Sequence, residues 1–422
     1  MAVAIRKLHH CPSRFKPRLG LRWIPSGEKP ALCLDRRPVN HCRNLGFSYR
    51  LSVTLPAPSS PTPKSRGSTS ETSGSGQDAR VSSSSAELDT RSIYVARSAE
   101  VDNNWLENRA NRWYKAGSSP DDNAGQYAFQ RLRQKWFTPR IRPKFKFVRD
   151  DKFYAVGSCF ARGIEHALTG SGVAVESMAP EFAKLQPVNK EVTGLGFTNK
   201  YNTFSILNEL RWALDPEAAF PVDSIFQVTE STWFDPHSTP TLELAGFSET
   251  LNRRALLQTV AKRVAHCRSL IITLGLVEVW RDCEANVYTN STPIRSVLKP
   301  DPNRYEFHLT SFVENWDSLE SIHALLTRFG HPDLRIVITV SPVPLMATFS
   351  KMDVVVANTY GKSLLRTVAE EWAAAHPNVD YFPSYEIVQN SDRAAVWETD
   401  LRHVTGAAVQ HIMDLFVRKY IE

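Results

Sequence analysis

A serine, a histidine and an aspartate stand at points where strands are predicted to meet helices. Ser158 directly follows the apolar run Phe153–Gly157, and Asp400 lies three residues before His403, ahead of a predicted helix that begins at Gly406. A serine hydroxyl attacks a carbonyl carbon when a histidine takes its proton and a carboxylate orients that histidine. Taken singly, each residue also has a structural explanation: a helix N-cap for Ser158, a structural histidine for His403, and a charge at a helix start for Asp400. Their shared placement favours a catalytic triad.

The elements that must position these residues alternate between short apolar runs and longer amphipathic segments. Strands are predicted over 153–157, 172–176, 269–275, 335–341 and 379–382. Helices are predicted over 160–168, 203–214, 251–266, 354–376 and 406–420. Such alternation is typical of a parallel sheet covered by helices on both faces, a three-layer α/β/α fold. Ligands bind beyond the carboxyl ends of the strands in sheets of this kind, which is where Ser158 is expected to lie.

Several motifs along residues 140–420 resemble a known family. The pentapeptide Gly157-Ser158-Cys159-Phe160-Ala161 is the signature of the GSCFA family, which is similar to the SGNH (GDSL-like) hydrolases. The other segments that resemble it are Tyr201-Asn-Thr-Phe-Ser-Ile-Leu, Thr273-Leu-Gly-Leu-Val-Glu-Val-Trp280, Ser341-Pro-Val-Pro-Leu345, Tyr381-Phe-Pro-Ser-Tyr-Glu-Ile387 and the pair Asp400 and His403. The resemblance implies a flavodoxin-like fold of the SGNH type.

The resemblance also implies roles for individual residues. Ser158 would be the nucleophile, and His403 and Asp400 would match the closing D-x-x-H block. SGNH enzymes also supply a glycine N–H and an asparagine side chain from two middle loops. Here the loop after the second predicted strand contains Gly194, Gly196, Asn199 and Asn202, of which Asn202 is favoured because it lies just before a helix. Gly275 is a further oxyanion or substrate-binding candidate. The loop after Gly275 should offer an asparagine but carries Glu278, and an ionised carboxylate cannot donate a hydrogen bond. Glu278 is therefore a candidate substrate-binding residue, a partner of Arg281, or a salt-bridged loop carboxylate.

The function that these residues predict is hydrolysis of an ester through an acyl-serine intermediate, without a metal or an organic cofactor. The resemblance implies a small molecule or a carbohydrate ester as the substrate, with removal of an O-acetyl group from a sugar as one form. Acyl transfer to a sugar hydroxyl on the same triad is an alternative, because the acceptor depends on how well water is kept out. A carbohydrate- or ligand-binding module that kept the fold but lost catalysis is the alternative from another class.

The charge of the chain is unevenly distributed. The formal net charge is +7, yet residues 1–80 hold fourteen Lys and Arg against four acidic residues, so the rest is slightly acidic. A slightly acidic body argues against a nucleic-acid partner. No apolar stretch approaches the roughly 20 residues of a membrane span, so a soluble protein is expected.

Cysteine and histidine spacings predict neither a disulfide framework nor a metal site. Cys159, beside Ser158, is expected to be a buried apolar residue. His237, His308 and His331 are expected to be solvated.

Three regions are predicted along the chain. Residues 1–91 form a basic, Ser/Pro-rich tail that we expect to be disordered, residues 92–139 form a helical lead-in, and residues 140–422 form the domain that carries the motifs. A cytoplasmic location is expected. The alternative is an organelle, if the Arg- and Ser-rich tail is a transit peptide.

Overall fold

The structure is a computed structural model that describes residues 94, 96–114, 127–185, 196–240, 242–293 and 295–422. Contacts divide the chain into residues 1–85 and residues 86–422, and the described residues all belong to the second unit. The predicted tail over 1–91, with any transit segment in it, lies outside the described residues. No helix in the described ranges combines the length and the apolar character needed to cross a membrane.

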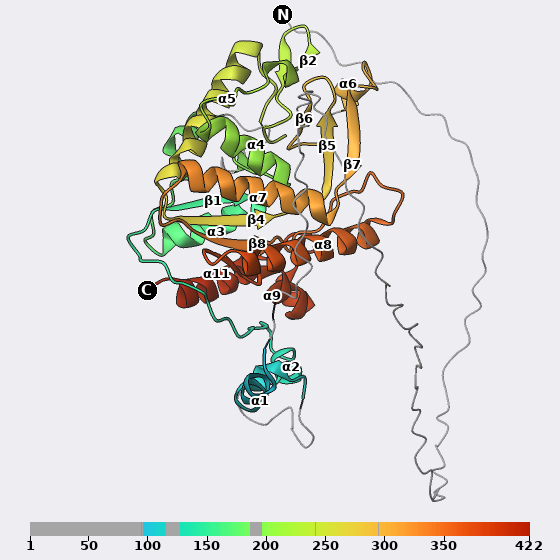
Figure 1. Cartoon of the computed structure of the whole chain (residues 1–422). Coiled ribbons are helices and arrows are strands. Elements are labelled where there is room, and N and C mark those ends of the chain that lie inside the picture. The colour runs from blue at the N-terminus through green and yellow to red at the C-terminus, as the bar shows by residue number, and fades with distance from the viewer. Residues whose placement is uncertain (1–93, 95, 115–126, 186–195, 241, 294) are drawn as a thin grey trace, which may run out of the picture. The chain divides into compact units, whose positions relative to one another are not determined.

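The central element is a parallel sheet whose strands follow the order β1-β4-β8-β9 (Figure 1). The strands are β1 (Phe153–Gly157), β4 (Ser269–Leu274), β8 (Arg335–Val340) and β9 (Val379–Tyr381). The strand predicted over 172–176 is reduced to one bridge between Val175 and Phe153. With that bridge counted as the outermost position, the chain order across the sheet is 2-1-3-4-5, which is the flavodoxin-like order.

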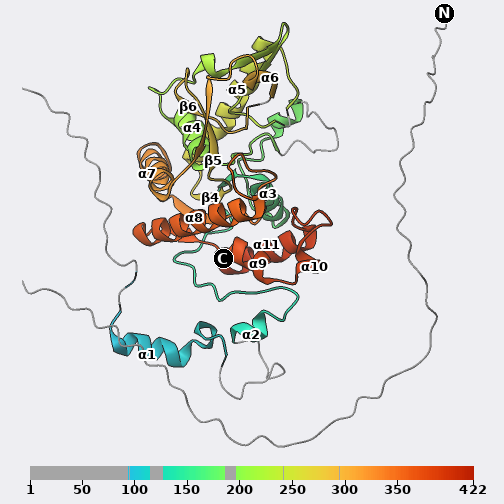
Figure 2. The same cartoon turned by 90° about the vertical axis from the view of Figure 1, so that its right-hand side faces the viewer.

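Helices cover both faces of this sheet, as the three-layer prediction required. On one face lie α4 (Thr203–Leu214), α7 (Phe312–Phe329) and α8 (Val354–Ala375). On the other face lie α3 (Cys159–Gly170), α9 (Ser384–Asn390) and α11 (Gly406–Tyr420), with α10 (Arg393–Val396) packed beside α9 and α11 (Figure 2).

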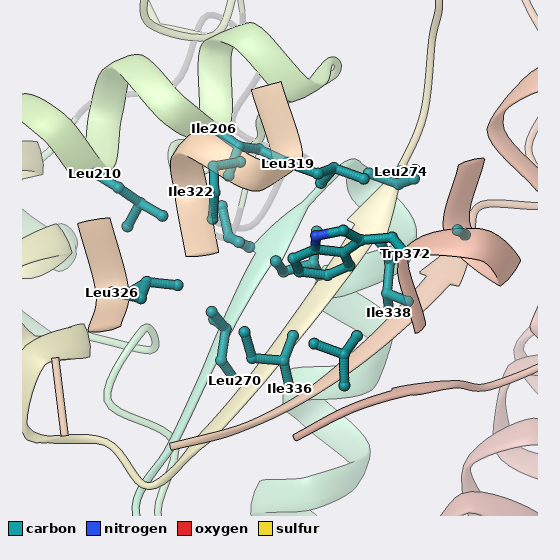
Figure 3. Packing of buried hydrophobic residues seen from close by; sticks show 14 of the residues in the cluster. Ile206, Leu210, Leu270, Leu274, Leu319, Ile322, Leu326, Ile336, Ile338 and Trp372 are labelled. Atoms are coloured by element: carbon teal, nitrogen blue, oxygen red, sulfur yellow. The ribbon is translucent and has the colours of Figure 1, made fainter. Parts of the chain in front are cut away.

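Alternating strand residues feed two separate cores. Tyr154 and Val156 of β1 pack into the core under α4, α7 and α8, whereas Phe153 and Ala155 pack into the core under α3, α9 and α11. This alternation follows from the two-residue period of a strand, and because both faces are covered the strands consist mainly of apolar residues. Figure 3 shows the first core closing around the buried ring of Trp372.

A smaller antiparallel sheet, β6-β5-β7, follows the carboxyl end of β4 (Figure 1). It is built from β5 (Glu278–Asp282), β6 (Val287–Tyr288) and β7 (Tyr305–Leu309). The remaining described elements are α1 (Ser98–Glu107), η1 (Arg109–Asn111), α2 (Ala128–Arg131), η2 (Pro180–Lys184), η4 (Val222–Ser224), β2 (Phe226–Thr229), β3 (Thr232–Phe234), α5 (Phe247–Ala261), η5 (Lys262–His266) and α6 (Arg295–Leu298). The small sheet extends the wall of the crevice at the carboxyl end of β4.

Candidate active site

The carboxyl ends of three neighbouring strands open into one cavity of about 480 Å³. Ser158 follows β1, Gly275 follows β4 and Ser341 follows β8, and all three line the cavity. Asn202 and Glu278 line it as well, so the structure brings together four of the six predicted site residues. Asp400 and His403 are not among the lining residues, although Arg402 between them is.

Ser158 has a free hydroxyl. The residue precedes α3 in the N-cap position, but its side chain makes no capping hydrogen bond. Ser158 is only 6% exposed, and its Oγ has no hydrogen-bond partner among the described residues. A buried hydroxyl without a partner is costly to fold, so the N-cap explanation does not account for this serine.

Gly157 lets the chain reach this position. Its φ is +144°, and a Cβ there would lie 2.4 Å from the carbonyl oxygen of Thr273 on the neighbouring strand. Only glycine tolerates both the dihedral and the close approach. The glycine of the signature thus has a steric reason that is independent of chemistry.

Two backbone N–H groups beside Ser158 are also free. Neither the N–H of Ser158 nor that of Gly275 makes a hydrogen bond with a described residue. The carbonyl of Leu274 accepts from the Ser341 N–H at 2.8 Å on the β8 side, so the Gly275 N–H, on the opposite edge of that peptide plane, points to the β1 side. A Cβ on Gly275 would lie 3.7 Å from the Cβ of Ser158. Two unpaired N–H groups next to a serine hydroxyl are donors of the kind that an oxyanion hole requires.

Asp400 and His403 form a hydrogen-bonded dyad in the loop before α11. His403 Nδ1 lies 2.6 Å from Asp400 Oδ2, and Asp400 Oδ1 accepts the backbone N–H groups of His403 and Arg402, both at 2.9 Å. These backbone hydrogen bonds, followed by the bond from the His403 side chain, hold the pKa of Asp400 well below its usual range. Asp400 is therefore ionised and places the proton of a neutral His403 on Nδ1.

The other ring nitrogen of His403 contacts Arg402. The guanidinium of Arg402 lies 3.0 Å from His403 Nε2, and because arginine only donates, Nε2 accepts. The unprotonated Nε2 is the form that a general base needs. No hydrogen bond joins His403 to Ser158 in this arrangement, since Ser158 Oγ has no partner among the described residues. The His403 side chain is 55% exposed, so it has room to turn.

The side chains of the two remaining candidates, Asn202 and Glu278, are hydrogen-bonded to other groups of the protein. Asn202 caps α4, accepting from the Ser205 N–H at 2.7 Å, and its amide donates to the Thr289 carbonyl at 3.2 Å. The Glu278 carboxylate accepts from the Thr348 hydroxyl and from the Phe349 N–H. Glu278 thus holds the segment after β8 and does not pair with Arg281, whose partners are Glu306 and Asn286.

Two expectations about other residues are wrong. Cys159 is exposed and lines the cavity, because as the first residue of α3 it points to the same crevice as Ser158. His237 is 2% exposed, because its ring packs against Trp212 and Phe220 and bonds to Ser224 Oγ. No three His, Cys, Asp or Glu side chains in the described ranges are grouped as a metal site would be.

Lys362 is a buried group that sequence reasoning missed. It lies on α8, is 2% exposed, and its ammonium donates to the Gly275 carbonyl at 2.9 Å. The Leu276 N–H at the other edge of that peptide donates to the Tyr201 carbonyl at 2.8 Å, so this peptide is fixed from both sides. A lysine within the apolar stripe formed by Leu365, Val368 and Trp372 is the signal that could have found it.

Burial lowers the pKa of Lys362 to about 7 from an ordinary 10.5. Between these values the unfolded chain keeps a proton that the folded chain has lost, so raising the pH favours the folded state. Relative to Lys362→Met, the wild type should gain about 2 kcal/mol of unfolding free energy between pH 7 and pH 9. Urea unfolding at the two pH values measures this gain. The exposed Lys351→Met variant is the control, and an equal difference from wild type at both pH values would contradict the assignment.

Fold and cavity together define a three-layer α/β/α protein with a free serine hydroxyl and two free N–H groups at the carboxyl ends of its parallel strands. The chain matches the GSCFA family over residues 152–416 and belongs to that family. No curated protein matches the chain. Among solved structures, it is similar to a Clostridium thermocellum family 3 carbohydrate esterase at 10% identity, over 64% of this chain and 94% of that one, with a TM-score of 0.29.

Proposed function

We propose that this protein is a serine esterase that cleaves an ester through an acyl-serine intermediate, with Ser158, His403 and Asp400 as its triad. The observation that carries the proposal is the unpartnered Oγ of Ser158 beside the free N–H groups of Ser158 and Gly275. A nucleophile and an oxyanion hole are the two parts of acyl chemistry that must coincide in space. The dyad of Asp400 and His403 would supply the base.

The first half of the reaction forms the acyl-enzyme. The Ser158 Oγ attacks the carbonyl carbon while His403 Nε2 takes the hydroxyl proton. The tetrahedral oxyanion is stabilised by the N–H groups of Ser158 and Gly275 and by the N-terminus of α3. When the bond to the alcohol breaks, the proton passes from His403 to the leaving oxygen.

The second half hydrolyses the acyl-enzyme. Water gives its proton to His403 and adds to the acyl carbon, and the proton returns to Ser158 Oγ as the acid leaves. This cycle needs His403 to leave Arg402 and face Ser158, and the half-exposed His403 side chain has the freedom to do so. The neighbouring Arg402 lines the cavity, so the loop that carries Asp400 and His403 borders the cavity that holds Ser158.

A ligand-binding module of the same fold is a second candidate, because His403 Nε2 contacts Arg402 and not Ser158. The full chain, assayed on short-chain nitrophenyl esters before and after treatment with a fluorophosphonate, separates the two. The esterase proposal predicts turnover that the phosphonate abolishes. Absence of both turnover and phosphonylation would overturn it in favour of the binding module.

A further inference from the structure

One wall of the cavity is apolar. Residues 343–349 follow β8 and bring Val343, Leu345, Met346 and Phe349 to the cavity, where they meet Trp280 of β5. The rings of Trp280 and Phe349 pack edge to face with their centroids 5.2 Å apart. A volume of 480 Å³ lies within the roughly 300–1,000 Å³ of small-molecule sites. This cavity has far more apolar room than an acetyl group would fill.

Several of the polar side chains that line the cavity already bind other protein groups, whereas the Ser158 hydroxyl and the Trp280 indole N–H have no partner among the described residues. Asn290 accepts from the Tyr201 N–H at 2.9 Å, and its amide donates to the carbonyls of Asn199 and Ser238. The Ser291 hydroxyl donates to the same Ser238 carbonyl at 2.6 Å. With Asn202 and Glu278 also occupied as described above, the lining offers few directed groups for the hydroxyls of a sugar.

Glu278 gives this wall a fixed position. Both carboxylate oxygens accept from residues 348 and 349, and Leu345 is tied to α8 by the Asn358 side chain, which accepts from its N–H at 3.2 Å. Met346 and Phe349 are 80% and 50% exposed, so they continue the apolar surface to the mouth of the cavity. Methionine adapts to chains of different shape, which suits a flexible ligand.

We infer that the cavity binds the acyl group of the ester, and that this group is an apolar chain of about six to ten carbons. The inference rests on the proposed esterase function. His403 protonates the leaving alcohol, so the alcohol lies on the side of the loop before α11. The acyl group, on the other side of the scissile bond, then lies against the apolar wall formed by residues 343–349 and Trp280.

The test is the acyl-length profile of the full chain on nitrophenyl acetate, butyrate and octanoate. Complete burial of the six further methylenes of octanoate would raise kcat/KM on the order of a thousandfold. We expect about a 10- to 100-fold rise, because the mouth of the cavity stays open. A flat or falling profile with turnover still blocked by a fluorophosphonate would overturn the inference and leave the esterase proposal standing. No turnover of any ester would overturn both.

Two variants locate the effect. Met346→Ser and Phe349→Ser change exposed side chains, so folding is expected to survive. Each should lower kcat/KM for octanoate about tenfold and leave acetate within about twofold. Val313→Ser on α7, a 44% exposed apolar residue outside the cavity, should change neither. Equal losses on acetate and octanoate would contradict an acyl-binding wall.

Discussion

Ser158→Ala is expected to lower kcat for a nitrophenyl ester by about 10⁴-fold or more, with the fold intact. The hydroxyl makes no hydrogen bond that holds the structure, so its loss removes the nucleophile without leaving a buried partner unsatisfied. The remaining activity would come from the oxyanion hole and from binding alone. Steady-state kinetics with circular dichroism of both proteins measures the effect.

The control is Ser171→Ala, a serine at the other end of α3 whose hydroxyl donates to the Ala167 carbonyl at 2.9 Å. It should keep wild-type kcat. The combined variant Ser158→Ala/His403→Ala should fall no further than Ser158→Ala alone, since residues that act as a unit are not additive. Turnover by Ser158→Ala equal to that of the wild type would contradict the assignment of the nucleophile.

Glu209→Gln is expected to lower the unfolding free energy by about 3–5 kcal/mol. Glu209 Oε2 lies 2.6 Å from the Lys200 ammonium and 2.7 Å from the Arg254 guanidinium, and all three are buried. Asp235 also pairs with Arg254, so Lys200 is the cation that would lose its only carboxylate partner among the described residues. A buried charge without a counter-charge carries a large desolvation cost.

The cluster of Lys200, Glu209 and Arg254 also holds a loop that lines the cavity. Lys200 precedes Tyr201 and Asn202, which line the cavity, and its backbone N–H donates to the Gly157 carbonyl at 2.8 Å. Its ammonium also donates to the His237 carbonyl at 2.8 Å. Loosening of this loop would therefore displace the cavity lining as well as lower stability.

The same cluster predicts a pH dependence. Burial alone would raise the pKa of Glu209, but Arg254 and Lys200 outweigh it and lower the pKa to about 2. Below about pH 4.5 the unfolded chain binds a proton that the folded chain does not, so this stability is lost as the pH falls towards 2. Urea unfolding compares wild type, Glu209→Gln and the exposed Glu249→Gln, whose pair with Arg253 is worth below about 1 kcal/mol. Similar losses in both variants would contradict the cluster's role.

The parts of the fold that local pattern controls were predictable. The helices at 203–214 and 406–420 have the predicted bounds, because Asn202 and Thr405 cap them where the apolar periodicity begins. Helix α7 was missed despite its capping box of Ser311 and Glu314. The small sheet before this helix was also missed. Its strands are short and pair residues far apart in the chain, such as Glu278 with Leu309, so they leave little local pattern.

The candidate site divides in the same way. The positions of Ser158 and Gly275 at strand ends follow from the apolar runs that precede them. The partners of Glu278, Lys362 and Asn202 depend on contacts across 71, 87 and 87 residues of chain, which no local pattern records. The prediction of a full strand over 172–176 was wrong, because the chain leaves the sheet edge after the two hydrogen bonds that flank Val175.

Trapping the acyl-enzyme tests the central claim most directly. The full chain is mixed with a nitrophenyl ester, quenched in acid and digested, and the peptide that contains Ser158 and Cys159 is fragmented by mass spectrometry. The account predicts the acyl group on the oxygen of Ser158. An acyl group on the sulfur of Cys159, which lines the same cavity, or an unmodified peptide from a chain that turns over the ester, would contradict it.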